Sequence, residues 1–447
     1  MFNGAKKAVG DKFVEQLSDY MSKNPERNIE KTINMLNKLA KTEEHKRQLA
    51  NAQKILADPD SNWHELYLSI MTGVNPKVRN RLAVNFLVHS ALLGLPQQRV
   101  LETKLGHGIP WAILIDPTDR CNLRCKGCWA GEYTRKNDLD NELLDRIITE
   151  GEELHIHFYV LSGGEPLVRK QDIVKLAQKH KDSVFHVFTN GTLIDDKFAA
   201  QCVEAGNITF AISVDGFEEA TDARRGQGVF QKIMQAADIL KRYGLFYGFS
   251  TTYHRKNVEE VCSDTYIEML IDKGFRFGWY FTYIPIGAEP DLEFMATPAQ
   301  RAYAYERIHE MRQTKPIFIA DFWNDGQATD GCIAGGRRYF HINAAGEVEP
   351  CAFIHYANGN IHNMSVCDAL KTPLFRAYQQ KYPFNENMLR PCPFIDNPQK
   401  LAECVNESCA HCTQQNNLDV NDMAKRLETY AMEWGQAADE LWGKCLG

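Results

Sequence analysis

The chain has 447 residues, of which 44% are hydrophobic and 24% are charged, as is normal for soluble globular proteins. This length is too great for one ordinary domain and predicts two or three. The formal net charge of −7 argues against general nucleic-acid binding, which requires a basic face.

Targeting signals and cysteine content indicate the compartment. The first residues, Met-Phe-Asn-Gly-Ala-Lys-Lys, lack the apolar core of a signal peptide, and no uncharged apolar run is long enough to span a membrane. Thirteen cysteines in a chain without an export signal favour a reducing compartment. We therefore expect no membrane span and a cytoplasmic location, in an anaerobe or in a cell that can shelter exposed clusters.

Residues 1–107 are predicted to form an N-terminal helical domain. Apolar side chains recur at helical spacing over residues 28–51, and Pro76 suits the first turn of a further helix. The most apolar stretch of the chain is residues 82–95. It predicts a buried core helix, and the alternative is a surface that docks a lipid or another apolar substrate.

Residues 108–320 alternate between strand-like and helix-like segments. The strand-like runs are 111–115, 158–161, 184–188, 208–214, 246–251 and 277–283. The helix-like segments are near 140–154, 170–180, 195–205, 229–243, 257–273 and 298–314. Six such units in series predict a parallel sheet with right-handed crossovers, and in barrels of this kind the chemistry lies at the carboxyl ends of the strands.

The remaining chain has a different character. Residues 321–415 are rich in cysteine, glycine, asparagine and proline, which predicts a small domain held together by metal. Residues 343–350 predict a tight hairpin that delivers Cys351 just beyond its second strand. Residues 416–447 predict one closing amphipathic helix.

The strongest chemical signal is a cysteine triplet at the end of the first predicted strand. Cys121, Cys125 and Cys128 place three thiols within eight residues, a soft and compact ligand set that suits an iron–sulfur cluster. Three ligands for a four-iron cluster leave one iron open, as a catalytic site requires. Zinc sites usually separate Cys-x2-Cys pairs by a longer loop, so zinc and reduced structural thiols are the less favoured alternatives.

This Cys-x3-Cys-x2-Cys run resembles the hallmark of the radical S-adenosylmethionine (SAM) enzymes. The resemblance implies an α/β fold in which a partial (β/α)6 TIM-like barrel lies between the helical N-terminal domain and the cysteine-rich C-terminal domain. It also implies that the open iron of a [4Fe-4S] cluster binds SAM, and that an electron from a flavodoxin- or ferredoxin-like reductant splits the C5′–S bond. The resulting 5′-deoxyadenosyl radical would abstract hydrogen from a substrate. One departure is Gly127, where the family usually has an aromatic residue that packs on adenine.

Segments that follow later strands resemble cofactor contacts of the same family. The run Leu161-Ser-Gly-Gly-Glu-Pro resembles the segment that binds the methionine amino group, and Tyr283-Ile-Pro-Ile-Gly-Ala-Glu resembles the late adenine-binding segment. Polar residues at the ends of strands three to five are further candidates, although turn formation is an alternative role for them. The residues expected to contact the cofactor are Gly163, Gly164, Glu165, Asn190, Ser213 and Thr251.

A second cysteine group resembles the SPASM or twitch auxiliary-cluster domain. Cys332 and Cys351 frame the pattern Cys-x13-Gly-x4-Cys, although the full seven-cysteine motif is not present. We expect one auxiliary cluster, a [4Fe-4S], held by Cys332, Cys351 and Cys392 with a fourth ligand from Cys412 or Cys409. Two alternatives remain open: the last cysteines bind a separate metal, or the cluster keeps three thiolates and an open iron that meets the substrate.

The substrate is not evident from the sequence, and three functions are possible. An enzyme that acts on a small molecule or lipid is slightly favoured by the apolar residues 82–95. A maturase that modifies peptides or proteins is common among relatives with such an auxiliary domain, but the first 105 residues lack the β-rich character of a leader-peptide recognition module. A non-catalytic electron carrier or sensor is the remote alternative, since an open-iron loop beside Gly-Gly-Glu indicates catalysis.

Overall fold

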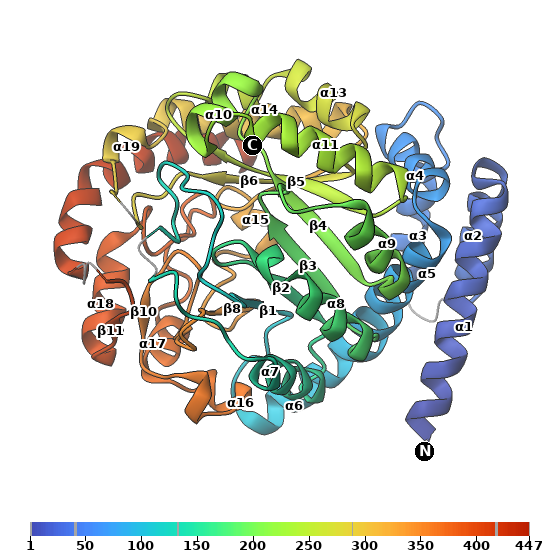
Figure 1. The fold of residues 1–447 in the computed structure, drawn as a ribbon, viewed down its shortest axis with the longest axis horizontal. Coiled ribbons are helices and arrows are strands. Elements are labelled where there is room, and N and C mark those ends of the chain that lie inside the picture. The colour runs from blue at the N-terminus through green and yellow to red at the C-terminus, as the bar shows by residue number, and fades with distance from the viewer. Residues whose placement is uncertain (1, 40–42, 132–133, 288, 416–418, 447) are drawn as a thin grey trace.

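A nine-stranded sheet runs through the middle of the molecule in the order β7-β6-β5-β4-β3-β2-β1-β8-β9 (Figure 1). The computed structural model describes residues 2–39, 43–131, 134–287, 289–415 and 419–446. The strands are β1 (Ala112–Ile115), β2 (Phe158–Leu161), β3 (Val184–Thr189), β4 (Ile208–Ser213), β5 (Tyr247–Tyr253), β6 (Phe277–Thr282), β7 (Phe318–Asp321), β8 (Tyr339–Ile342) and β9 (Val348–Glu349).

The six predicted strands are present, and the sheet continues beyond them at both edges. β7 pairs with β6, and β8 pairs with β1, both in parallel, while β9 returns antiparallel to β8. The predicted hairpin is therefore confirmed, with Gly346 at φ 84° in its turn. Because β8 and β9 come from residues 321–415, that part of the chain completes the barrel sheet.

Helices between the strands cover the outer face of the sheet (Figure 1). They are α7 (Asn141–Glu153), α8 (Lys170–Lys179), α9 (Asp196–Ala205), α10 (Glu218–Arg225), α11 (Val229–Arg242), α12 (Val258–Val261), α13 (Asp264–Asp272) and α14 (Pro298–Thr314), with 3₁₀ turns η2 (Pro166–Arg169) and η3 (Leu292–Phe294). Asp140 and Asp195 cap α7 and α9 by accepting backbone N–H groups, and Thr297 and Gln300 form a capping box on α14. Each of these caps satisfies a backbone N–H group in the first turn of its helix.

The N-terminal part is helical, as predicted. It comprises α1 (Phe2–Lys23), α2 (Pro25–Leu39), α3 (Glu43–Leu56), α4 (Asn62–Gly73), α5 (Pro76–Ala83), the π-helix η1 (Val84–Gly94) and α6 (Leu95–Leu105). On the buried side of η1, the Asn85 amide donates to the carbonyls of Lys181 and Ser183, directly before β3. Leu87 and Leu92 of the same helix stay exposed, so residues 82–95 are buried on one side only.

The C-terminal part packs against the other end of the sheet. Its elements are α15 (Gly326–Thr329), β10 (Tyr356–Ala357), η4 (Ile361–Asn363), α16 (Val366–Ala369), α17 (Pro373–Lys381), α18 (Pro398–Ser408), β11 (His411–Cys412) and the closing helix α19 (Val420–Leu446). α19 lies on α14, where the Arg301 guanidinium stacks 4.0 Å from the centroid of the buried Trp434 ring and pairs with Asp396.

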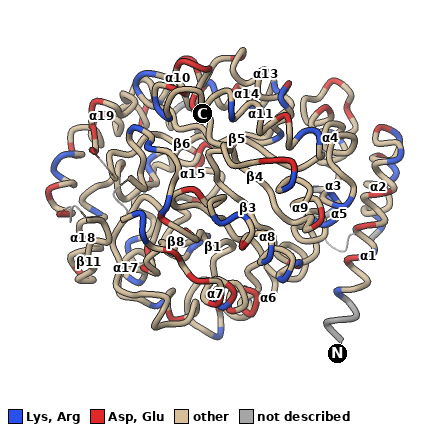
Figure 2. The backbone as a smooth tube through the Cα atoms, viewed as in Figure 1, with Lys and Arg blue, Asp and Glu red and all other residues tan. Residues whose placement is uncertain are grey.

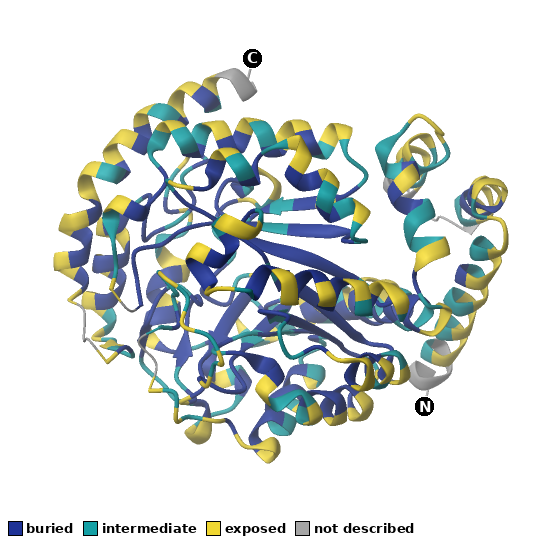
Figure 3. Cartoon of the chain, turned by 45° about the horizontal axis from the view of Figure 1, so that its top comes forward, coloured by how far each residue is buried: buried dark blue, intermediate teal, exposed yellow. Residues whose placement is uncertain are grey.

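Burial and charge follow this layering. The central strands are buried while the surrounding helices expose one side (Figure 3). Acidic and basic residues are interspersed along the outer helices in the view of Figure 2. None of the helices in the described ranges is long and apolar enough to cross a membrane. The expected α/β fold, with a partial barrel between N-terminal helices and a cysteine-rich C-terminal part, is confirmed.

Candidate active site

A cavity of about 260 Å³ lies inside the barrel and reaches the carboxyl ends of the strands. The loop after β1 brings Cys121, Cys125 and Cys128 to its wall together. The lining also includes Gly163, Gly164, Glu165, Asn190, Ser213, Arg224, Arg225, Ser250, Thr252, Thr282 and Tyr283, and a largely aromatic group made of Trp111, Phe158, His186, Phe188, Trp279, Phe281, Phe322 and Phe353. Polar and sulfur groups therefore share one space with an aromatic surface.

The three thiols of the loop are close enough to influence one another. Burial raises the pKa of Cys121 to about 11, and the neighbouring Cys128 and Cys125 add to this effect. Burial also raises the pKa of Cys128, against the opposing charges of Arg224 and Arg225. The backbone N–H of Leu123 donates to Cys121 Sγ at 3.4 Å. Buried thiols of this kind become thiolates only beside positive charge.

Gly163 and Gly164 hold the segment after β2 against the start of the cysteine loop. Gly163 has φ +103°, and a Cβ there would lie 2.6 Å from the Thr118 carbonyl oxygen. A Cβ on Gly164 would lie 2.3 Å from the carbonyl oxygen of Arg120. The same oxygen accepts the Glu165 N–H at 2.8 Å. The close backbone approach that these glycines permit is therefore an approach to residues 118–120, directly before Cys121.

Glu165 is buried and already holds three donors. Its carboxylate accepts the Leu167 N–H at 2.9 Å, the Thr189 hydroxyl at 2.7 Å and the Asn190 N–H at 2.7 Å. Burial raises the pKa of Glu165, and these donors oppose the rise. A carboxylate has about four acceptor positions, so one remains for a further donor in the cavity.

Two arginines share one buried carboxylate beside the cysteine loop. Arg224 Nη1 and Arg225 Nε donate to the same Oδ2 of Asp215, at 2.7 and 2.6 Å. Arg225 Nη1 lies 4.0 Å from Cys125 Sγ. Burial opposes ionisation of Asp215, but the two guanidinium groups outweigh it and hold the pKa of this carboxyl well below its usual range. Two positive charges against one negative charge leave a net positive charge at the cavity wall.

The aromatic ring of Tyr283, directly after β6, packs where Gly127 lacks a side chain. Gly127 has φ +62°, and a Cβ there would lie 2.6 Å from Cε2 of Tyr283. The Tyr283 hydroxyl accepts the Asp291 N–H at 3.2 Å, and its ring meets Phe294 edge to face. Tyr283 opens the predicted adenine-binding segment, but its contact with Gly127 was not predicted. The missing aromatic at 127 and the aromatic at 283 are the two signals that could have predicted it.

Two predicted contacts from β4 and β5 have different outcomes. Ser213 lines the cavity, as do Ser250 and Thr252. Thr251 does not line it: the Thr251 hydroxyl donates to the Val214 carbonyl at 2.7 Å and contacts the Tyr266 hydroxyl at 2.8 Å. The prediction for Thr251 is corrected because successive side chains of a strand point to opposite faces, so Ser250 and Thr252 take the inward positions.

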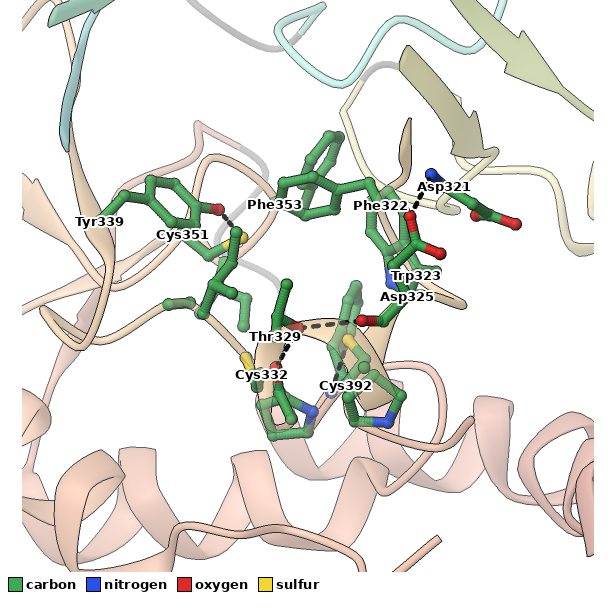
Figure 4. Close-up of a pocket in the computed structure, with 18 of the residues that line it drawn as sticks. Asp321, Phe322, Trp323, Asp325, Thr329, Cys332, Tyr339, Cys351, Phe353 and Cys392 are labelled. Carbon is green, nitrogen blue, oxygen red and sulfur yellow. Dashed lines mark hydrogen bonds between the residues drawn. The ribbon is translucent and has the colours of Figure 1, made fainter. Parts of the chain in front are cut away.

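A second, smaller cavity of about 100 Å³ gathers three further cysteines (Figure 4). Cys332, Cys351 and Cys392 line it, and burial raises the pKa of all three thiols, to about 12 for Cys351 and about 11 for Cys392. The Tyr339 hydroxyl donates to Cys351 Sγ at 2.7 Å, as the dashed line in Figure 4 marks. This cavity shares five lining residues with the barrel cavity, namely Trp279, Phe322, Ile333, Tyr339 and Phe353.

The last cysteines do not join this group. Cys412, on β11, lines a different small cavity with His355 and Phe394. Cys409 is exposed at the end of α18, in the left-handed region at φ 53°, and Cys404 is buried within α18. Among the described residues, no three or more His, Cys, Asp or Glu side chains are placed to hold a single metal ion.

Comparison with known proteins agrees with this arrangement. Residues 115–263 match the model of the radical SAM superfamily, and residues 332–413 match that of the SPASM iron–sulfur cluster-binding domain. The mycofactocin maturase MftC of Mycolicibacterium smegmatis is 30% identical over 286 residues, which cover 60% of this chain and 71% of that protein. The chain belongs to the radical SAM superfamily.

Other relatives of this radical SAM chain differ in the reactions that their names describe. The AdoMet-dependent heme synthase of Oleidesulfovibrio alaskensis is 26% identical over 310 residues, covering 62% of this chain and 77% of that protein. Among solved structures, Streptococcus suis SuiB bound to S-adenosylmethionine has a TM-score of 0.56 at 15% identity, covering 77% of this chain and 82% of SuiB. Native anSMEcpe with bound AdoMet has a TM-score of 0.51 at 18% identity, covering 74% of this chain and 99% of anSMEcpe. These structural matches concern the fold.

The residues present fit the cofactors that membership implies. A radical SAM enzyme with a SPASM domain binds a [4Fe-4S] cluster, SAM and auxiliary iron–sulfur. Each of the two cavities collects three thiols. Burial raises the pKa of Cys121 and Cys128 in the first cavity and of all three thiols in the second, and a cluster supplies the positive charge that favours their thiolates. Soft thiolates are the donor set that such clusters take.

Proposed function

We propose that this radical SAM enzyme cleaves SAM reductively and removes hydrogen from an apolar small molecule or lipid bound in the barrel. The observation that carries the proposal is the single cavity in which Cys121, Cys125 and Cys128 share a wall with an aromatic surface. Bound to these thiols, the cluster would supply the electron that splits the C5′–S bond. A flavodoxin- or ferredoxin-like protein is the reductant that we expect.

Residues around the triplet provide the complementary groups for SAM. The net positive charge of the Arg224 and Arg225 pair faces the cavity and suits the carboxylate of the methionine moiety. The remaining acceptor position of Glu165 suits the ammonium group. Asn190 and Ser213 lie on the same wall, within reach of the ribose, and the Tyr283 ring offers the adenine a stacking surface in place of a residue at 127.

The aromatic walls favour an apolar substrate. Phe188, Trp279 and Phe281 expel water from the space next to the triplet, which protects a radical from solvent. They also offer few partners to the many N–H and C=O groups of a peptide, each of which is costly to bury unpaired. The regular structure in the described residues before β1 is helical, unlike a β-rich leader-peptide module.

Peptide modification is the second candidate, and the relatives favour it. Besides the mycofactocin maturase, the PqqA peptide cyclase of Granulibacter bethesdensis is 25% identical over 309 residues, covering 64% of this chain and 80% of that protein. A precursor peptide that is altered by the reduced enzyme and SAM would support this candidate over the first.

We propose one auxiliary cluster, held by Cys332, Cys351 and Cys392. The shared lining residues put this group beside the substrate space, where it can accept an electron or hold a polar atom of the substrate. The fourth-ligand role that we expected for Cys412 or Cys409 is less favoured, since neither lines the cavity. The placement of Cys409 and Cys412 favours the alternative in which three thiolates hold the cluster and one of its irons stays open towards the substrate.

The test is SAM cleavage by the anaerobically reconstituted enzyme. With dithionite and SAM, we expect 5′-deoxyadenosine on chromatography, and Cys125→Ala should reduce its formation to background. Cys202→Ala is the matched control, because Cys202 is buried in α9 outside both cavities and should keep normal cleavage. Normal product formation by Cys125→Ala would overturn the assignment.

A further inference from the structure

His186 on β3 is a buried polar side chain within the aromatic part of the barrel cavity. The residue is 4% exposed and its ring lines the cavity. It lies four residues before Asn190, which directly follows β3, and this places it about 13 Å deeper in the barrel than the predicted ribose contact. None of the roles assigned above to the SAM site uses this side chain.

One ring nitrogen of His186 is held by the protein and the other is not. Nδ1 lies 2.8 Å from the hydroxyl of Thr209, the residue that faces His186 across the β3–β4 pair. Nε2 is buried and has no hydrogen-bond partner in the described part of the chain. A buried polar atom without a partner is costly, and native proteins leave few of them.

The neighbours of this ring are aromatic. Phe158 stacks on it at 5.8 Å between centroids, Phe188 meets it edge to face at 5.1 Å, and Phe277 lies at 5.5 Å. Burial lowers the pKa of His186 to about 3, so the imidazole is neutral at physiological pH. A neutral ring offers one hydrogen bond without a charge that the substrate would have to balance.

We propose that His186 Nε2 binds a hydroxyl group on an otherwise apolar substrate, with the aromatic walls around the rest of the molecule. A hydroxyl both donates and accepts, so it pairs with Nε2 whichever way the Thr209 hydroxyl sets the tautomer. The proposal rests on the proposed function, because it deepens the substrate class to an alcohol or phenol with an apolar body. It makes His186 a residue that determines specificity.

The test compares two probes that differ mainly in one hydroxyl group, 2-naphthol and 2-methylnaphthalene. Binding of each is measured by equilibrium dialysis to the reconstituted full-length enzyme with SAM and without reductant. For His186→Phe, we expect the Kd of 2-naphthol to rise about tenfold while that of 2-methylnaphthalene stays within about twofold, because a tenfold change is what one lost hydrogen bond produces.

Matched variants separate a lost hydrogen bond from a folding defect. His157→Phe alters a second histidine whose pKa burial lowers, directly before β2 and outside the cavity lining, and should change neither Kd. His186→Leu should repeat the selective loss if the phenylalanine variant unfolds. An equal effect on both probes, or none on either, would overturn the proposal, since Nε2 would then bind water or nothing. Because this binding assay needs no turnover, its outcome does not depend on the SAM-cleavage assay that tests the proposed function. A failure of one proposal can therefore be told from a failure of the other.

Discussion

Single residues around the cysteine triplet act through charge and close packing. Asp215 does not line the barrel cavity; it orients Arg224 and Arg225, and its buried carboxylate fixes both guanidinium groups by one oxygen. Likewise the glycines after β2 act on the protein itself, since they admit the carbonyls of Thr118 and Arg120. The position of the cysteine loop therefore depends on residues outside the cysteine triplet.

Arg225→Lys tests the role of the guanidinium geometry. Lysine keeps the charge but cannot both donate to Asp215 and reach Cys125, so we expect the Kd for SAM to rise roughly tenfold. Equilibrium dialysis with labelled SAM measures it on the reconstituted enzyme. Arg242→Lys, at an exposed ion pair with Asp196, is the control and should leave the Kd unchanged. An unaltered Kd in Arg225→Lys would argue against a SAM contact.

Gly163→Ala tests the close approach to the cysteine loop. We expect lower iron content and a loss of more than about 2 kcal/mol in the free energy of unfolding, because the new Cβ meets Thr118 and Asp116 in addition to the left-handed strain. Gly228→Ala is the control, because Gly228 also has a positive φ of +76° but no atom lies within 4 Å of an added Cβ. This variant should lose only about 1–2 kcal/mol in the free energy of unfolding and should keep its full iron content. Iron assay and urea unfolding compare the two, and equal results would refute the packing argument.

At the scale of elements, apolar runs predicted six strands because parallel strands are buried on both faces. The four-residue strands β7 and β8 were missed. His341 interrupts the apolar residues of β8, whereas β7 lies on a short apolar run, 317–320, that was overlooked. The prediction for Thr251 failed because it ignored the alternation of side chains along β5. The cysteine groups were predictable from spacing, whereas the Tyr283 contact with Gly127 and the open nitrogen of His186 depend on pairing between distant strands.

The end of α8 gives a pH-dependent prediction. Burial lowers the pKa of His180, but hydrogen bonds to Glu152 and Asp145 outweigh it, so the folded pKa lies above 6.5. The contribution of His180 is therefore complete below pH 6.5 and is lost as the pH rises through the folded pKa. We expect His180→Gln to cost about 1 kcal/mol at pH 6 and much less at pH 9. Urea unfolding at both pH values measures this, and a cost that does not fall with pH would contradict it.

At the scale of the whole molecule, the two cysteine cavities are fixed to one sheet. β1 leads into the triplet loop, and β8, its parallel neighbour, leads through the hairpin to Cys351. His341 on β8 lies 2.9 Å from Asp116, which directly follows β1, and 2.7 Å from Glu349 on β9. Burial opposes the charge on His341, but the two carboxylates raise its pKa to about 10, so a buried ion pair joins barrel and hairpin.

Cys392→Ser tests whether the two sites are independent in metal content. We expect iron to fall from about eight to about four atoms per chain, because one cubane is lost, while SAM cleavage without substrate persists. Cys404→Ser, in α18 outside the auxiliary cavity, should keep the full iron content. Unchanged iron in Cys392→Ser would remove Cys392 from the ligand set.

The pairing of β8 with β1 also has a consequence during synthesis. Until the ribosome has released β8, one edge of β1 has no neighbour, and an unpaired strand edge promotes association with other chains. We expect a fragment of residues 1–320 to form inclusion bodies, and a fragment extended to residue 360 to be recovered in larger part from the supernatant. Sedimentation of cell lysates checks this, and equal recovery would contradict it. The barrel therefore stays open to aggregation after strands β1 to β7 have been made, because the strand that covers the free edge of β1 follows them in the chain.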